Sequence, residues 1–129
     1  SALFFVTASI VSAGAVQLTK SLFGRPRPEQ ILVLADYGSF PSGHTANAAT
    51  MAVALAIIFP SVWVVIAGVV WTVAMAFGRT FAHAHWLSDT AGGAMLGAGV
   101  VFVVAAAFAV LLAREQARVR EKAGSRLTA

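Results

Sequence analysis

A small set of cations, histidines and one acid stands out in a chain that otherwise carries few charges. They fall in two stretches, residues 20–44 and 79–89, and they are Lys20, Arg25, Arg27, His44, Arg79, His83, His85 and Asp89. Arginine binds phosphate through its planar fork and lysine binds it as a point charge. Histidine can donate and accept protons near neutral pH. The combination therefore indicates an anion site.

The tetrapeptide Pro41-Ser42-Gly43-His44 precedes an apolar segment and predicts the start of a helix. Serine is a favoured N-cap residue, and glycine lets the backbone approach a ligand closely. The free N–H groups at a helix start bind phosphate, aided by the helix dipole. An ordinary capped helix without a ligand is the alternative interpretation of this tetrapeptide alone.

His85 and Asp89 are four residues apart at the start of the last apolar segment. If a helix has begun there, the two side chains share a face. A carboxylate beside one ring nitrogen fixes the histidine tautomer and makes the other nitrogen more basic. The pair taken alone is equally compatible with a structural role at a helix start.

Four apolar segments must position these groups, and they run from about residue 2 to 19, 45 to 59, 62 to 77 and 87 to 113. Hydrophobic residues make up 59% of the 129 residues and charged residues only 11%, whereas soluble domains carry roughly 25% charged residues. A spanning helix needs roughly 20 residues. The sequence therefore predicts an all-α transmembrane bundle with four spanning helices and no nucleic-acid partner. Gly93 and Gly97 form a small-xxx-small pair that predicts close helix packing.

Charge predicts the orientation of the bundle. Residues 114–129 carry five basic residues against two acidic ones, and positive segments tend to remain in the cytoplasm. We expect a catalytic membrane domain at 1–113 and a basic cytoplasmic tail at 114–129. Alternation of the helices then brings the 20–44 and 79–86 connections together on the external face.

The spacing of the polar residues resembles the signature of the type 2 phosphatidic acid phosphatase family, which includes glucose-6-phosphatase and the vanadium haloperoxidases. The three parts are Lys20-x6-Arg27-Pro28, then Pro41-Ser42-Gly43-His44, then Arg79-x5-His85-x3-Asp89, in the family's order. The one departure is Gly78, where the family has serine. This puts the fine positioning of Arg79 in doubt but not the reaction class.

The resemblance implies a role for each matched residue. His85 would be the nucleophile, Asp89 would orient and activate it, and His44 would be the general acid and later the base. The phosphoryl oxygens would be held by Lys20, Arg27, Ser42, Gly43 and Arg79. It also implies that the reaction needs no metal or cofactor. Arg25 and His83 lie outside the signature. Arg25 is expected to touch the lipid headgroup or a second phosphate, and His83 to be an interfacial residue rather than a metal ligand or a second acid.

The substrate implied is a lipid phosphate held in the bilayer: phosphatidic acid, phosphatidylglycerol phosphate or a polyprenyl diphosphate such as undecaprenyl diphosphate. An external site fits the polyprenyl carrier slightly better. A phosphotransferase with the same site and a non-catalytic anion-binding or transport protein remain alternatives, whereas the apolar segments argue against a soluble haloperoxidase. Because the family has six spanning helices, two further helices are expected before residue 1.

Overall fold

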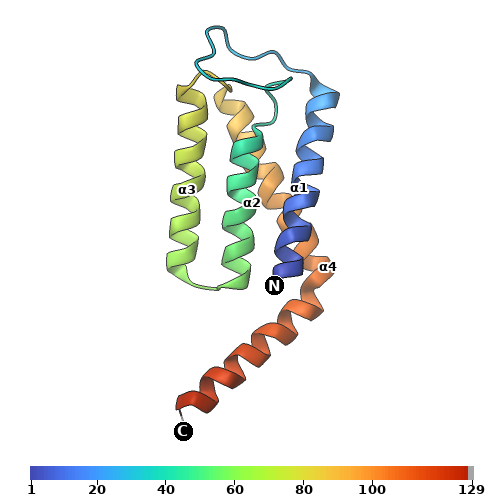
Figure 1. The fold of residues 1–129 in the computed structure, drawn as a ribbon, viewed down its shortest axis with the longest axis vertical. Coiled ribbons are helices and arrows are strands. Elements are labelled where there is room, and N and C mark those ends of the chain that lie inside the picture. Colours follow the sequence, from blue (N-terminus) through green and yellow to red (C-terminus); the bar gives the residue numbers. More distant parts are fainter. Residues whose placement is uncertain (128–129) are drawn as a thin grey trace.

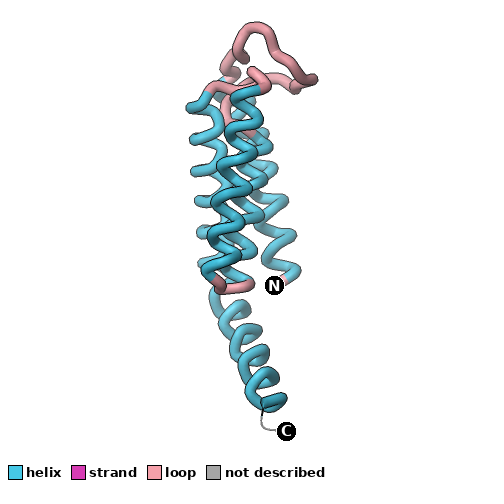
Figure 2. The backbone as a smooth tube through the Cα atoms, turned by 90° about the vertical axis from the view of Figure 1, so that its left-hand side faces the viewer, coloured by secondary structure: helices cyan, strands magenta, loops and turns pink. Residues whose placement is uncertain are grey.

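The computed structural model describes residues 1–127, and these form a helical bundle without strands. The elements in chain order are α1 (Ala2–Phe23), α2 (Gly43–Ile58), α3 (Val62–Phe81) and α4 (Leu87–Leu127). Figure 1 shows the upper part of α4 behind α1 and α2, and a long connection that crosses the top of the bundle. Figure 2 shows that the loops gather at the two ends of the helices. The predicted all-α fold class is confirmed.

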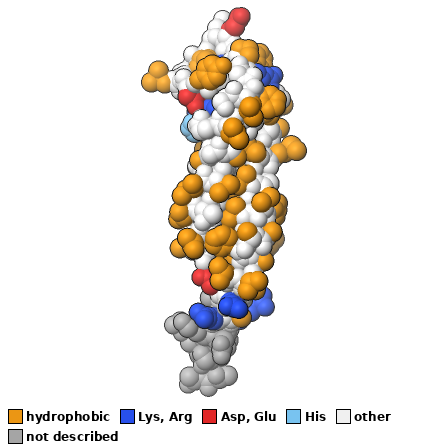
Figure 3. Space-filling model, turned by 90° about the vertical axis from the view of Figure 1, so that its right-hand side faces the viewer, with side chains coloured by type: hydrophobic (Ala, Val, Ile, Leu, Met, Phe, Trp, Pro, Cys, Tyr) orange, Lys and Arg blue, Asp and Glu red, His pale blue; other side chains and the backbone are white. Residues whose placement is uncertain are grey.

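Length and composition make this a multi-pass membrane protein. Three segments are long and apolar enough to cross a bilayer, namely Ala2–Phe23, Val62–Phe81 and Leu87–Arg118, and the 16-residue α2 is a shorter apolar helix. Helix α3 buries none of its residues within the described chain. Its exposed valines and tryptophans therefore suit a lipid environment. Figure 3 shows hydrophobic side chains over the middle of one face and charged side chains towards both ends.

Helix α2 is the centre of the bundle, because it contacts α1, α3 and α4. A Cβ atom added to Gly93 would lie 2.4 Å from the Ser42 carbonyl oxygen, and one added to Gly97 would lie 2.2 Å from that of Ala46. Glycine is thus required for α4 to approach α2 this closely, which agrees with the packing predicted from their spacing. In the described chain α1 and α3 do not contact each other, so the face of α2 between them is left open.

Three helices extend beyond their predicted C-terminal ends, and one of them, α3, continues past residue 77 to Phe81. Helix α1 continues past Thr19 to Phe23, and Gly24 ends it in the left-handed conformation (φ 53°) with its N–H bonded to the Lys20 carbonyl oxygen. Helix α4 continues past Ala113, so residues 114–127 of the predicted tail are a continuation of the helix, while residues 128 and 129 lie outside the described chain. The extension of α1 places Lys20 in the last helical turn, beside the connection to α2.

Candidate active site

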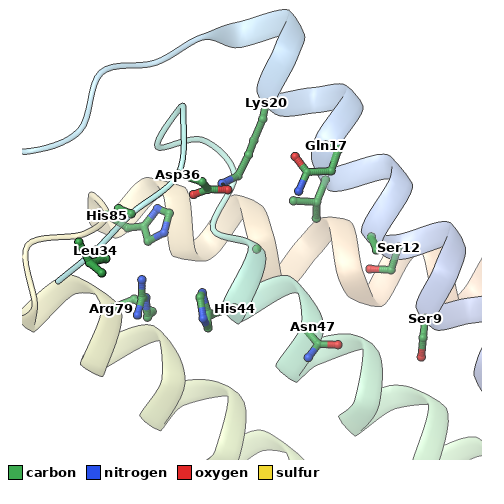
Figure 4. A pocket seen from close by; sticks show the side chains of 14 residues that line it. Ser9, Ser12, Gln17, Lys20, Leu34, Asp36, His44, Asn47, Arg79 and His85 are labelled. Atoms are coloured by element: carbon green, nitrogen blue, oxygen red, sulfur yellow. Dashed lines mark hydrogen bonds and ion pairs between the residues drawn. The ribbon is translucent and has the colours of Figure 1, made fainter.

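The structure brings five of the eight predicted site residues around one cavity of about 490 Å³. They come from α1, α2, α3 and the turn before α4, and they are Lys20, Gly43, His44, Arg79 and His85. Figure 4 shows the side chains of Lys20, His44, Arg79 and His85 around this space. The cavity lies at the end of the bundle covered by residues 24–42. The other three predicted residues, Arg27, Ser42 and Asp89, do not line it.

His85 is buried, with 3% of its surface exposed. Its Nδ1 lies 2.7 Å from the Ser39 carbonyl oxygen. Because a carbonyl oxygen can only accept, Nδ1 carries the proton and Nε2 carries the lone pair. Arg27 Nη1, 3.3 Å away, donates to that lone pair. Burial lowers the pKa of His85 to about 4, with the Arg27 charge adding to this, while the Ser39 bond opposes it. The ring is therefore a neutral base at physiological pH.

Asp89 is fully buried, and its carboxylate oxygens accept hydrogen bonds from residues other than His85. Arg25 donates to Oδ1 at 2.7 Å, and the Trp86 backbone N–H donates to Oδ2 at 2.8 Å. The second bond is half of a capping box, since Asp89 is the third residue of α4 and reaches back to the residue before it. Oδ2 lies 3.8 Å from His85 Nδ1. The expected contact between His85 and Asp89 is thus an electrostatic one at this distance, and the carbonyl of Ser39 takes the hydrogen bond.

Arg25 has a structural position that the sequence did not reveal. It donates to Ser88 Oγ and to Asp89 Oδ1, both at 2.7 Å, and its guanidinium lies 5.8 Å from the centre of the Trp86 ring. Trp86 in turn donates from Nε1 to the Pro26 carbonyl oxygen at 3.2 Å. These contacts fasten the 25–27 segment to the start of α4. Arg25 and Asp89 are 64 residues apart in the sequence, and no pattern in the sequence links the two.

Arg79 carries an unused donor. Its Nε is buried and has no hydrogen-bond partner among the described residues. Buried polar groups nearly always have a partner, and an exception calls for a ligand or water. Arg79 lines the cavity, so its side chain lies next to any ligand bound there.

Lys20 and Arg27 share one carboxylate that the sequence analysis did not single out, that of Asp36. Lys20 Nζ lies 2.8 Å from Oδ2 and Arg27 Nη2 lies 2.6 Å from Oδ1. Burial by itself would raise the pKa of Asp36, but the Lys20 hydrogen bond and the two positive charges outweigh it and lower that pKa. Asp36 therefore holds a negative charge where the signature cations would hold phosphate. A lone acid in a loop gives no pattern by which to find it.

Arg27 is also a structural hub of the loop. Its guanidinium donates to the backbone carbonyl oxygens of Asp36, Gly38 and Ala84 at 2.6–3.0 Å. It contacts His85 Nε2 at 3.3 Å, although it does not line the cavity. In this structure Arg27 thus faces the ring of His85 rather than the cavity.

The start of α2 was predicted to cap the helix and to bind a ligand, and in the structure Ser42 and Gly43 are suited to one of these roles each. The buried Ser42 side chain is the N-cap, and its Oγ accepts from the backbone N–H of Thr45 at 3.4 Å and from the Thr45 hydroxyl at 3.1 Å. It does not line the cavity, whereas Gly43 does. Among these residues, the helix N-terminus and not the serine hydroxyl is presented to a ligand.

A family model described as the PAP2 superfamily matches residues 1–113. The chain belongs to this superfamily. No individual curated protein and no solved structure matches the chain. PAP2 proteins are generally phosphatases, and this chain is assigned phosphatase-type chemistry on a phosphoric ester at that level.

The departure at Gly78 from the PAP2 signature is accommodated locally. A Cβ atom at Gly78 would meet nothing within 4 Å. The glycine therefore leaves open space at the end of α3, and Arg79 lines the cavity without help from a serine hydroxyl. No group of three or more His, Asp or Glu residues in the described part of this PAP2 chain lies close enough together to hold a metal ion. A metal-free reaction stays a prediction.

Proposed function

We propose that this chain hydrolyses a phosphate monoester or diphosphate of a membrane lipid through a covalent intermediate on His85. The observation that carries the proposal is that one cavity is lined by four of the predicted residues, namely Lys20, His44, Arg79 and His85. It combines a neutral, buried imidazole with the unpartnered Nε of Arg79. Such a site supplies a nucleophile, an acid and positive charge around one tetrahedral anion.

The first chemical step forms a bond between His85 Nε2 and phosphorus. Arg27 leaves Nε2 and turns to a phosphoryl oxygen, and the lone pair attacks phosphorus in line with the leaving oxygen. The bond from phosphorus to that oxygen breaks, and His44 gives the leaving alkoxide or phosphate a proton, so the step requires His44 in its protonated form. The imidazole becomes a cation, which the Ser39 carbonyl at 2.7 Å and the Asp89 carboxylate at 3.8 Å stabilise.

The second step returns the enzyme to its starting state. His44, now neutral, takes a proton from water, and the hydroxide attacks phosphorus. The bond from phosphorus to Nε2 breaks, its electron pair returns to the ring, and inorganic phosphate leaves. Lys20, Arg27 and Arg79 neutralise the charge on the phosphoryl oxygens in both steps, and the N–H groups at the start of α2 assist them.

The membrane position of the cavity supports a lipid substrate. The cavity lies at the end of apolar helices, and α1 and α3 leave a lateral opening over α2. A lipid could keep its chains in the bilayer while its phosphate enters between these helices. The basic residues of α4 at the opposite end favour a cytoplasmic location for that end and an external location for the cavity.

Phosphate release from phosphatidic acid, phosphatidylglycerol phosphate and undecaprenyl diphosphate in detergent tests the proposal. We expect His85→Ala to lower kcat by about 10³-fold or more. His83→Asn is the matched control, because His83 is exposed and has a positive φ of 51° that asparagine tolerates. It should keep full activity. Turnover by His85→Ala would remove the nucleophile assignment, and loss of activity in EDTA would contradict the metal-free reaction.

Trapping the intermediate provides a second test. Enzyme mixed with a lipid labelled in the terminal phosphate and denatured in alkali should retain label on His85. The label should be lost in acid, because a phosphoramidate bond is acid-labile. Absence of protein-bound label during rapid turnover would favour direct attack by water.

A further inference from the structure

Two carboxamide side chains line the cavity below the groups that would handle phosphate. Gln17 precedes Lys20 by three residues on α1, and Asn47 follows His44 by three residues on α2. Side chains three apart share a helix face and lie about 5 Å apart along the axis. Figure 4 shows Gln17 and Asn47 on facing helices, with Lys20 and His44 nearer the loop end. Each carboxamide therefore lies about one turn deeper in the bundle than its partner in the phosphate site.

Neither carboxamide is used by the protein itself, whereas the neighbouring hydroxyls are. Ser9 Oγ donates to the Phe5 carbonyl oxygen at 2.9 Å, and Ser12 Oγ shares a 2.7 Å bond with Thr50 Oγ1. Within residues 1–127, Gln17 and Asn47 have no side-chain hydrogen bond and both are exposed to the cavity. A carboxamide without a partner is costly at membrane depth. These two groups therefore need an external hydrogen-bonding partner.

This layer of the cavity is polar but uncharged. Beside the two carboxamides it is lined by Ser9, Ser12, Ala13 and Val16. The cations and the acid of the cavity are Lys20, Arg79 and Asp36, which belong to the phosphate end. A second phosphate at this depth would be a buried anion without a counter-charge. A hydrocarbon chain would leave the carboxamides without partners. A neutral group that accepts and donates hydrogen bonds satisfies both conditions.

We propose that Gln17 and Asn47 form a subsite for the neutral glycerol unit that links a phosphate monoester to its lipid, an inference that rests on the proposed phosphatase function. With the phosphate at Lys20, His44 and Arg79, the atoms one helical turn deeper are the ester or hydroxyl groups of that glycerol. Phosphatidic acid offers ester oxygens at this level, and phosphatidylglycerol phosphate offers a hydroxyl. A polyprenyl diphosphate offers its inner phosphate there, so the subsite disfavours the substrate that topology alone had slightly favoured.

The test compares substrates on the full chain in detergent. Gln17→Leu and Asn47→Leu keep side-chain size and remove hydrogen bonding. Together they should lower kcat/KM for phosphatidic acid and phosphatidylglycerol phosphate by about 10-fold or more, in line with the loss of one to two net hydrogen bonds. The values for undecaprenyl diphosphate and for water-soluble p-nitrophenyl phosphate, which lack the glycerol unit, should change less than about 3-fold. Leu18→Ala is the control, since Leu18 is exposed and does not line the cavity.

The outcomes separate the two proposals. An equal loss on all four substrates, or no loss on the two glycerol substrates, would overturn the subsite while leaving the phosphatase intact. Wild-type protein that releases phosphate from none of them would instead overturn the proposed function. The two glycerol substrates also identify the group recognised: a loss confined to phosphatidic acid supports the ester oxygens, and one confined to phosphatidylglycerol phosphate supports the hydroxyl.

Discussion

Replacing Asp36 with asparagine should tighten the binding of vanadate, a tetrahedral analogue of phosphate. The Asp36 carboxylate lies 2.8 Å from Lys20 Nζ and 2.6 Å from Arg27 Nη2. A bound phosphoryl group must displace this carboxylate or share the two cations with it. Asparagine has the same shape but no charge, so the substitution frees the cations and leaves the loop its side-chain volume.

The size of the effect follows from the exposure of the partners. Asp36 is 61% exposed at its side chain, but Lys20 and Arg27 are only 6% and 9% exposed. Exposed ion pairs are worth up to about 1 kcal/mol, and the near burial of the cations places these two at that upper limit. Two contacts give about 2 kcal/mol, or about 30-fold in an inhibition constant. Because the pKa of Asp36 is lowered, this competition should persist to pH values below the usual range of an aspartate pKa.

The assay is vanadate inhibition of phosphate release at low ionic strength, where screening is weakest. Glu29→Gln is the matched control, because it removes the same charge from the same loop and Glu29 is exposed. The control should leave the inhibition constant within about 2-fold. Weaker inhibition of Asp36→Asn would refute the competition and show instead that the carboxylate orients Lys20 and Arg27 for the ligand.

Two substitutions and one titration test the surroundings of the site. Arg25→Gln removes the countercharge of the fully buried Asp89; with Arg25 itself 40% exposed, we expect a loss of about 1–3 kcal/mol in stability, seen as a lower Tm in detergent and partly restored in Arg25→Lys. The His85 ring should titrate near pH 4 in ¹⁵N NMR spectra, since burial lowers its pKa to about 4 from 6.5. The unfolded chain then binds more protons between these values, so stability is complete above pH 6.5 and falls towards pH 4; a midpoint above 6 would exclude this environment. Gly78→Ser should fold and remain active, because its Cβ meets nothing within 4 Å, with a gain of about 0.5 kcal/mol in helix stability; a large loss of phosphatase activity would show that Arg79 needs the glycine.

The fold was predictable because each helix corresponds to a continuous apolar segment of the sequence. Membrane helices satisfy their own backbone hydrogen bonds, so length and composition are sufficient to identify them. Their ends were less predictable. Helix α1 continues to Phe23 because Gly24 supplies the left-handed cap, and α4 continues past Ala113 because the charged residues after it also favour a helix.

The sequence predicted the residues that share the cavity but not what holds them there. His44, His85, Lys20 and Arg79 were found from their types and spacing, and they line one cavity. The Ser39 carbonyl that fixes the His85 tautomer is a backbone group, and its use depends on how residues 24–42 fold. Asp36 and Arg25 act through contacts made by the same loop. Such contacts carry no periodicity, because a loop follows no repeating geometry.

Gly93 and Gly97 bring α4 directly against the backbone of α2. We therefore expect the side of the cavity formed by α2 and the start of α4 to be more rigid than the side formed by α1. The start of α2 and the start of α4 are joined backbone to backbone, also through the bond from the Ser42 N–H to the Asp89 carbonyl oxygen at 2.9 Å. We expect these two helix starts to keep a fixed spacing, whereas α1 and its loop can shift relative to them. A thinner or thicker bilayer that tilts α1 would change the distance between Lys20 and a bound headgroup. The spacing of the histidine-bearing segments, and with it the chemical step, would be preserved.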